Sequence, residues 1–61
     1  IRACSKQIIN TIKIPGFVYQ PSWLITEMSR RGFTPIETEN SINYLIEREI
    51  LKTSPDGVSI K

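Results

Sequence analysis

Residues 34–61 restrict the fold of this chain most, because they combine a helix start with a tight turn between two β-prone runs. Residues 34–37 (Thr-Pro-Ile-Glu) match a capping box with proline at the first helical position. Apolar residues then recur at helical spacing and predict a buried stripe: Ile42, Leu45 and Ile46. Residues 54–57 (Ser-Pro-Asp-Gly) predict a β-turn. We therefore expect a helix followed by a hairpin.

The first half of the chain predicts two more helices and a short strand. Residues 1–13 predict a first helix, which residues 15–16 (Pro-Gly) end. Its apolar positions are Ala3, Ile8, Ile9 and Ile12. Residues 17–19 (Phe-Val-Tyr) favour a short strand. Pro21 is suited to begin a second helix, and Gly32 to stand at its C-cap.

These elements predict an α+β winged helix-turn-helix: three helices, a short first strand and a C-terminal β-hairpin as the wing. With 61 residues the chain has room for a single domain, 1–61. The alternative is a plain three-helix bundle with a disordered tail. The expected core consists of Ile8, Ile9, Ile12, Trp23, Leu24, Met28, Phe33, Ile42, Leu45, Ile46 and Leu51. Trp23 also fits a second interpretation, because tryptophan anchors many interfaces.

Composition favours an ordinary soluble domain over a membrane protein. The chain is 39% hydrophobic and 23% charged. It has no apolar run near the roughly 20 residues of a membrane helix and no signal-peptide segment. A single cysteine, Cys4, has no partner for an internal disulfide. We therefore expect an intracellular protein of the nucleus or cytoplasm, without contact to a membrane.

The residues needed for catalysis or metal binding are missing from the sequence. The chain contains no histidine, so it offers neither a nucleophile–histidine pair nor a metal-ligand cluster. Glu37 and Glu39 are two residues apart on the predicted helix and point in different directions, so they cannot share a substrate. We expect a domain that is not an enzyme and that has no catalytic residue, metal or cofactor.

The negative charge of the predicted third helix argues against insertion of that helix into the major groove of DNA. The net charge of the chain is only +2. Asn40 and Asn43 are residue types that read base edges, but the predicted helix region is acidic. It carries Glu37, Glu39, Glu47 and Glu49 against Arg48 alone. Carboxylates near phosphates oppose binding. A DNA-binding domain that uses its basic first and second helices and its wing is the alternative function.

Several runs of the chain resemble the C-terminal winged-helix domain of cullins. The most specific is residues 42–51, Ile-Asn-Tyr-Leu-Ile-Glu-Arg-Glu-Ile-Leu, which is preceded by residues 29–35, Ser-Arg-Arg-Gly-Phe-Thr-Pro. Residues 24–28 (Leu-Ile-Thr-Glu-Met) are similar to the second helix of that family. Residues 8–13 (Ile-Ile-Asn-Thr-Ile-Lys) resemble the end of its first helix. The resemblance thus covers most of the chain.

The resemblance implies a protein-interaction domain in the scaffold of a ubiquitin ligase. Its partners would be a RING subunit and a ubiquitin-conjugating enzyme, which the domain would help to position. By the same resemblance Lys13 would accept a ubiquitin-like modifier, with Lys6 as the weaker candidate; a simple solvated lysine is the other interpretation of Lys13. The candidate interaction surface on the third helix consists of Glu37, Glu39, Asn43 and Arg48.

The modification of Lys13 can be tested directly. After incubation of the full ligase with the enzymes of its modifier, mass spectrometry should locate the attachment on Lys13. The Lys13→Arg variant should lose that attachment, because arginine has no primary amine to acylate. Attachment that persists in Lys13→Arg would remove this role from Lys13 while leaving the fold prediction unchanged.

Overall fold

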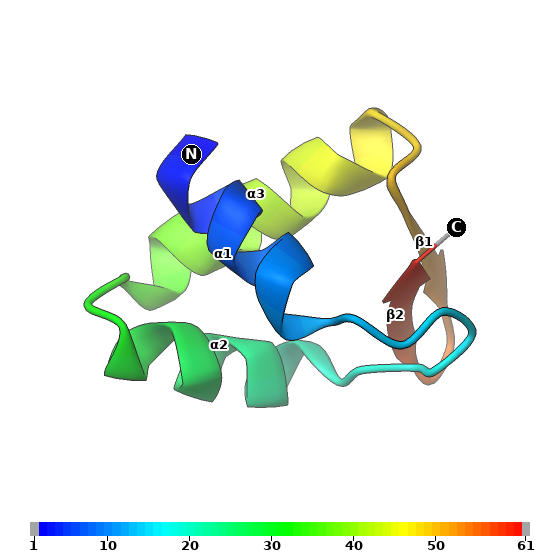
Figure 1. The fold of residues 1–61 in the computed structure, drawn as a ribbon, viewed down its shortest axis with the longest axis horizontal. Helices are drawn as coiled ribbons and strands as arrows, with labels where there is room; N and C mark the ends of the chain where they lie inside the picture. The colour runs from blue at the N-terminus through cyan, green and yellow to red at the C-terminus, as the bar shows by residue number, and fades with distance from the viewer. Residues whose placement is uncertain (1, 61) are drawn as a thin grey trace.

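A computed structural model of the chain, which describes residues 2–60, contains three helices followed by a two-stranded antiparallel hairpin (Figure 1). The elements are α1 (Arg2–Thr11), α2 (Pro21–Arg30), α3 (Pro35–Glu47), β1 (Leu51–Ser54) and β2 (Gly57–Ile60). Helices α1 and α2 both pack against α3. The hairpin lies at one end of the helices, beside the loop that joins α1 to α2 (Figure 1). The predicted α+β class is confirmed, and residues 51–60 are a hairpin rather than a disordered tail.

The capping box predicted at the start of α3 is present. The Glu37 N–H donates to Thr34 Oγ1 at 3.1 Å, and the Thr34 N–H donates to the Glu37 carboxylate at 3.0 Å. The hydrogen bonds from the Thr34 backbone and side chain hold the pKa of Glu37 below its ordinary value. Folding therefore favours the charged carboxylate. This contribution to stability is present above the ordinary pKa and is lost as the pH falls through the lowered one.

Gly32 closes α2 through a Schellman motif but lies one position beyond the C-cap, which is Arg31 rather than the predicted Gly32. Its φ is 89°, a left-handed conformation that favours glycine. The Gly32 N–H donates to the Ser29 carbonyl at 3.1 Å, and the Phe33 N–H donates to the Met28 carbonyl at 3.1 Å. The motif turns the chain sharply into the capping box of α3.

The end of α3 has the same hydrogen-bond pattern without a glycine. The Glu49 N–H donates to the Ile46 carbonyl and the Ile50 N–H to the Leu45 carbonyl, both at 3.0 Å. Glu49 has a φ of 60° and lies beyond the last helical residue, Glu47. The expectation that Glu49 adds to the charge of the helix is therefore wrong. The carboxylates within α3 are Glu37, Glu39 and Glu47.

The loop between α1 and α2 begins earlier than expected. Helix α1 ends at Thr11, so Lys13 lies outside it. A turn follows, in which the Phe17 N–H donates to the Ile14 carbonyl at 3.3 Å. Of the predicted first strand, only Tyr19 pairs with the sheet, through a bridge to Val58 in β2.

The core lies between the three helices and the inner side of the hairpin. Its buried apolar residues are Cys4, Ile8, Ile12, Tyr19, Leu24, Met28, Ile42, Leu45, Leu51 and Val58. Phe33 and Ile46 are partly buried against it. Seven of the predicted core residues are thus buried, whereas Cys4, Tyr19 and Val58 were not predicted.

Two core predictions are wrong. Trp23 is 42% exposed and Ile9 is 41% exposed. Each of these residues is adjacent in sequence to a residue that faces the core. Leu24 and Met28 are the buried apolar residues of α2, and Ile8 is buried on α1. Successive residues on a helix are rotated by about 100°, so the neighbour of a buried residue turns outward.

Among the described residues no helix is long and apolar enough to cross a membrane. Within residues 2–60 no cluster of three or more cysteine, aspartate or glutamate side chains is arranged to hold a metal ion.

Leu45 tests the packing of α3. Its side chain is almost fully buried, so Leu45→Ala should lower the free energy of unfolding by about 2–5 kcal/mol. Urea denaturation measures the loss. Ile36→Ala is the matched control, because Ile36 on the same helix is 70% exposed and its truncation should change stability by less than about 0.5 kcal/mol. Equal stabilities of the two variants would contradict the packing of α3.

Candidate functional site

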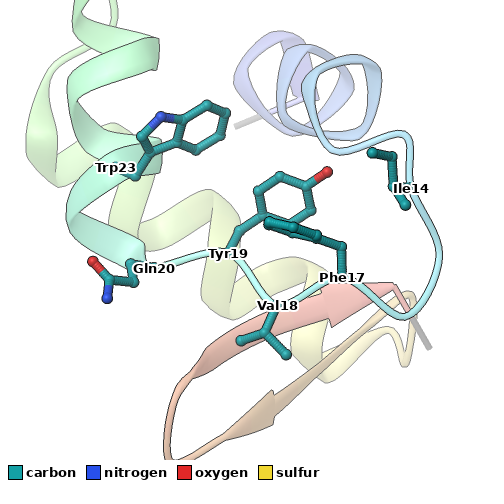
Figure 2. A pocket seen from close by; sticks show the side chains of 6 residues that line it. All are labelled: Ile14, Phe17, Val18, Tyr19, Gln20 and Trp23. Carbon is teal, nitrogen blue, oxygen red and sulfur yellow. The ribbon is translucent and has the colours of Figure 1, made fainter.

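An apolar groove of about 510 Å³ opens where the loop after α1 meets the start of α2 (Figure 2). It is lined by Ile14, Phe17, Val18, Tyr19, Gln20 and Trp23. Ile14 comes from the turn after α1, and Trp23 comes from the first turn of α2. The lining residues between them, 17–20, belong to the extended segment that joins the two helices. We call this the aromatic groove. Its volume lies within the roughly 300–1,000 Å³ of ordinary ligand sites.

Three aromatic rings form a row through the groove. Figure 2 shows the ring of Tyr19 between those of Phe17 and Trp23. The ring centroids of Phe17 and Tyr19 are 4.8 Å apart and those of Tyr19 and Trp23 are 5.5 Å apart, with tilted planes. These are favourable spacings for aromatic pairs. Each ring therefore packs against its neighbour without a bound partner.

The groove has a buried base and exposed walls. Tyr19 is buried and belongs to the core cluster. Phe17 is 53% exposed and Ile14 is 59% exposed. The structure describes seven large apolar residues as exposed, and four of them line this groove: Ile14, Phe17, Val18 and Trp23. Such a concentration is typical of interaction surfaces, whereas single exposed apolar residues are ordinary.

The backbone of Tyr19 holds the groove against the hairpin. The Tyr19 N–H donates to the Val58 carbonyl at 2.7 Å, and the Val58 N–H donates to the Tyr19 carbonyl at 2.9 Å. Gly57 makes this approach sterically feasible. A Cβ atom at Gly57 would overlap the Tyr19 carbonyl oxygen and lie 3.2 Å from Val18 Cγ1. Gly57 also has a φ of 148°, which favours glycine.

The charge around the groove differs from that of α3. Residues 2–26 contain Arg2, Lys6 and Lys13 and no acidic residue. Lys13 is exposed and immediately precedes Ile14 at one end of the groove. The nearest acidic residue on the hairpin is Asp56, which precedes Gly57 beside Val18. A cation thus precedes the groove at its Ile14 end, and the hairpin acid Asp56 is adjacent in sequence to Gly57, which lies near Val18.

The residues predicted as an interaction surface on α3 do not gather into one site. Glu37, Glu39, Asn43 and Arg48 are all exposed. Glu37 caps the first turn of the helix, whereas Arg48 is the C-cap, with its guanidinium 5.2 Å from the centre of the Tyr44 ring. Eleven residues of helix separate them by about 16 Å. Glu37 and Glu39 are rotated by about 200° from each other around the helix, so these residues are exposed on different sides of α3.

Sequence reasoning missed the aromatic groove, although part of its signal was present. Phe17 and Tyr19 alternate along an extended segment, and Trp23 follows four residues later at a helix start. The closure of the groove depends on the Tyr19–Val58 pairing, which joins residues far apart in the chain. Comparison with known protein families, curated proteins and solved structures finds no match to this chain. The resemblance to cullins stays a prediction from the sequence.

Substitution of Gly57 tests how the groove is held. Gly57→Ala should lower the free energy of unfolding by about 1–3 kcal/mol more than Gly32→Ala, because a crowded methyl group adds overpacking to backbone strain. Gly32 is a suitable control, since its φ is also positive and no atom lies within 4 Å of its Cβ position. Urea denaturation measures both variants.

Hydrogen exchange of the Tyr19 amide provides a second test of how Gly57 holds the groove against the hairpin. The Tyr19 amide should exchange faster in Gly57→Ala than in Gly32→Ala when both are compared at equal global stability. Equal stabilities and equal exchange at Tyr19 would show that Gly57 does not hold the groove.

Proposed function

We propose that this chain is a winged-helix domain and that it works as a non-catalytic protein-interaction module, holding an apolar segment of a partner in the aromatic groove. The aromatic row carries this proposal: Phe17 and Trp23 are exposed and pack on either side of the buried Tyr19 ring. Tryptophan and tyrosine are enriched among the residues that dominate binding energy at protein interfaces, especially in preformed pockets.

The order and pairing of the elements support the winged-helix assignment. Two helices precede α3, and the hairpin of β1 and β2 follows it directly. Tyr19, between α1 and α2, pairs with β2 on the side away from β1. This gives the helix, short strand, helix, helix, hairpin order that a winged helix requires.

The exposed face of α3 supports a protein partner rather than DNA. Within its bounds, Pro35–Glu47, the helix carries three glutamates and no lysine or arginine. Glu37 and Glu39 lie in the half that a winged helix of the DNA-binding type inserts into the major groove. Their carboxylates would face phosphates without a compensating cation on the helix.

The resemblance to cullins provides a particular form of this function, in which the domain belongs to an intracellular ubiquitin-ligase scaffold. It would then lie beside a RING subunit and a ubiquitin-conjugating enzyme that carries ubiquitin. The exposure of Lys13, outside α1, leaves its amine accessible for a ubiquitin-like modifier. The aromatic groove begins at the next residue, Ile14, so a modifier at Lys13 would stand beside any partner in the groove.

Selection from a library of random linear peptides tests the proposed function. The immobilised domain should enrich peptides that bind in the aromatic groove. Trp23→Ala should weaken them about tenfold or more, because a central aromatic anchor contributes about 2 kcal/mol or more to binding. Ile36→Ala is the matched control, since Ile36 is exposed and lies outside the groove, and it should leave binding unchanged.

Two results would contradict the proposal. One is the absence of enriched peptides whose binding depends on Trp23. The other is sub-micromolar, sequence-selective binding of duplex DNA in about 150 mM salt, where we expect only non-specific binding on the order of 10⁻⁴ M or weaker. The second result would support the DNA-binding alternative.

A further inference from the structure

We infer that the aromatic groove binds an extended partner segment in which a bulky apolar side chain stands next to an acidic residue. The inference rests on the proposed function and adds to it the chemistry of the partner. Three features of the groove lead to it: its size, the backbone of Val18 and the charge of Lys13.

The size of the groove suits a short segment. About 510 Å³ holds a few side chains, comparable to a drug-sized ligand, and is too small to enclose a whole helix of 10–12 Å diameter. The row in Figure 2 runs from Trp23 over Tyr19 to Phe17 and then Ile14. One bulky apolar side chain placed on this row would cover rings that are now exposed to water.

The backbone of Val18 favours an extended partner. In an extended segment successive residues direct their N–H and C=O groups to opposite sides. Tyr19 directs both groups to Val58 in β2, so those of Val18 point away from the sheet. Within residues 2–60 the N–H and C=O of Val18 have no backbone partner. A partner strand can pair there, as in β-strand addition.

The charge of the surroundings selects an acidic neighbour for the apolar anchor. Lys13 is exposed next to the groove at Ile14. Among residues 2–60 the ion pairs are those of Glu27 with Arg30 and Arg31, so Lys13 has none. Asp56, which precedes Gly57 in the hairpin turn, is the opposing charge on the hairpin. Glu27, the next acid along α2, is 3.7 Å from both Arg30 and Arg31 and is neutralised by them. An acidic residue of the partner is therefore favoured near Lys13 and disfavoured near Asp56.

The peptides selected on the domain provide the probe. Those that depend on Trp23 should be enriched in aspartate or glutamate next to a large apolar residue, relative to the unselected library. At low salt, Lys13→Glu should weaken the tightest of them by about three- to five-fold, as expected for an exposed ion pair. Asp56→Asn should leave binding unchanged or make it tighter.

Lys6→Glu is the matched control for Lys13→Glu. It changes the net charge of the domain equally, but Lys6 lies on α1 beside a separate hollow that Ile9 and Ile50 line. Its effect on binding should be less than about two-fold, since separated exposed charges are screened. Isothermal titration calorimetry measures all three variants. A loss as large in Lys6→Glu as in Lys13→Glu would overturn the local role of Lys13.

The outcomes separate this inference from the proposed function. Peptides that depend on Trp23 but are neutral or basic, or that bind more tightly to Lys13→Glu, would overturn the inference and leave the function intact. Self-association that Trp23→Ala abolishes, seen by analytical ultracentrifugation, would assign the groove to a second copy. Binding to phosphatidylserine vesicles that depends on Trp23, without binding to any peptide, would assign it to a membrane surface. Both of these results would overturn the inference.

Discussion

The pair of hydrogen bonds between Tyr19 and Val58 is the constraint on which the arrangement of this small domain depends. It joins the loop between α1 and α2 to the hairpin, two segments far apart in the chain. With the Tyr19 backbone held there, its ring enters the core and its neighbours Phe17 and Val18 stay at the surface. One backbone interaction thus closes the core and builds the exposed groove.

This placement connects local sequence to the proposed function. The hairpin requires glycine at position 57 because Tyr19 approaches its backbone closely, so the same residue serves the turn and the groove. The start of α2 at Pro21 then places Trp23 in the first turn of the helix, where its ring reaches Tyr19. Rings that already pack against each other have less freedom to lose when a partner binds, which lowers the entropy cost of association.

Features that depend on neighbouring residues could be predicted from the sequence. The capping box of Thr34 and Glu37, the C-terminal Gly32 and the hairpin turn each involve groups within a few residues, and all three are present. Features set by tertiary contact could not be predicted. Leu24 and Trp23 are both apolar, and only the packing of α2 on α3 decides which one is buried. The aromatic groove was missed for the same reason.

Fluorescence of Trp23 tests the central claim, binding of a protein partner in the groove, most directly. Trp23 is the only tryptophan in the chain, so its emission reports on the groove without labelling. Titration with a peptide selected on the domain should shift the emission maximum to shorter wavelength and reduce quenching by iodide, because the partner covers an indole that is now partly exposed to water. Saturable binding with no change in either signal would show that partners bind elsewhere and would contradict the claim.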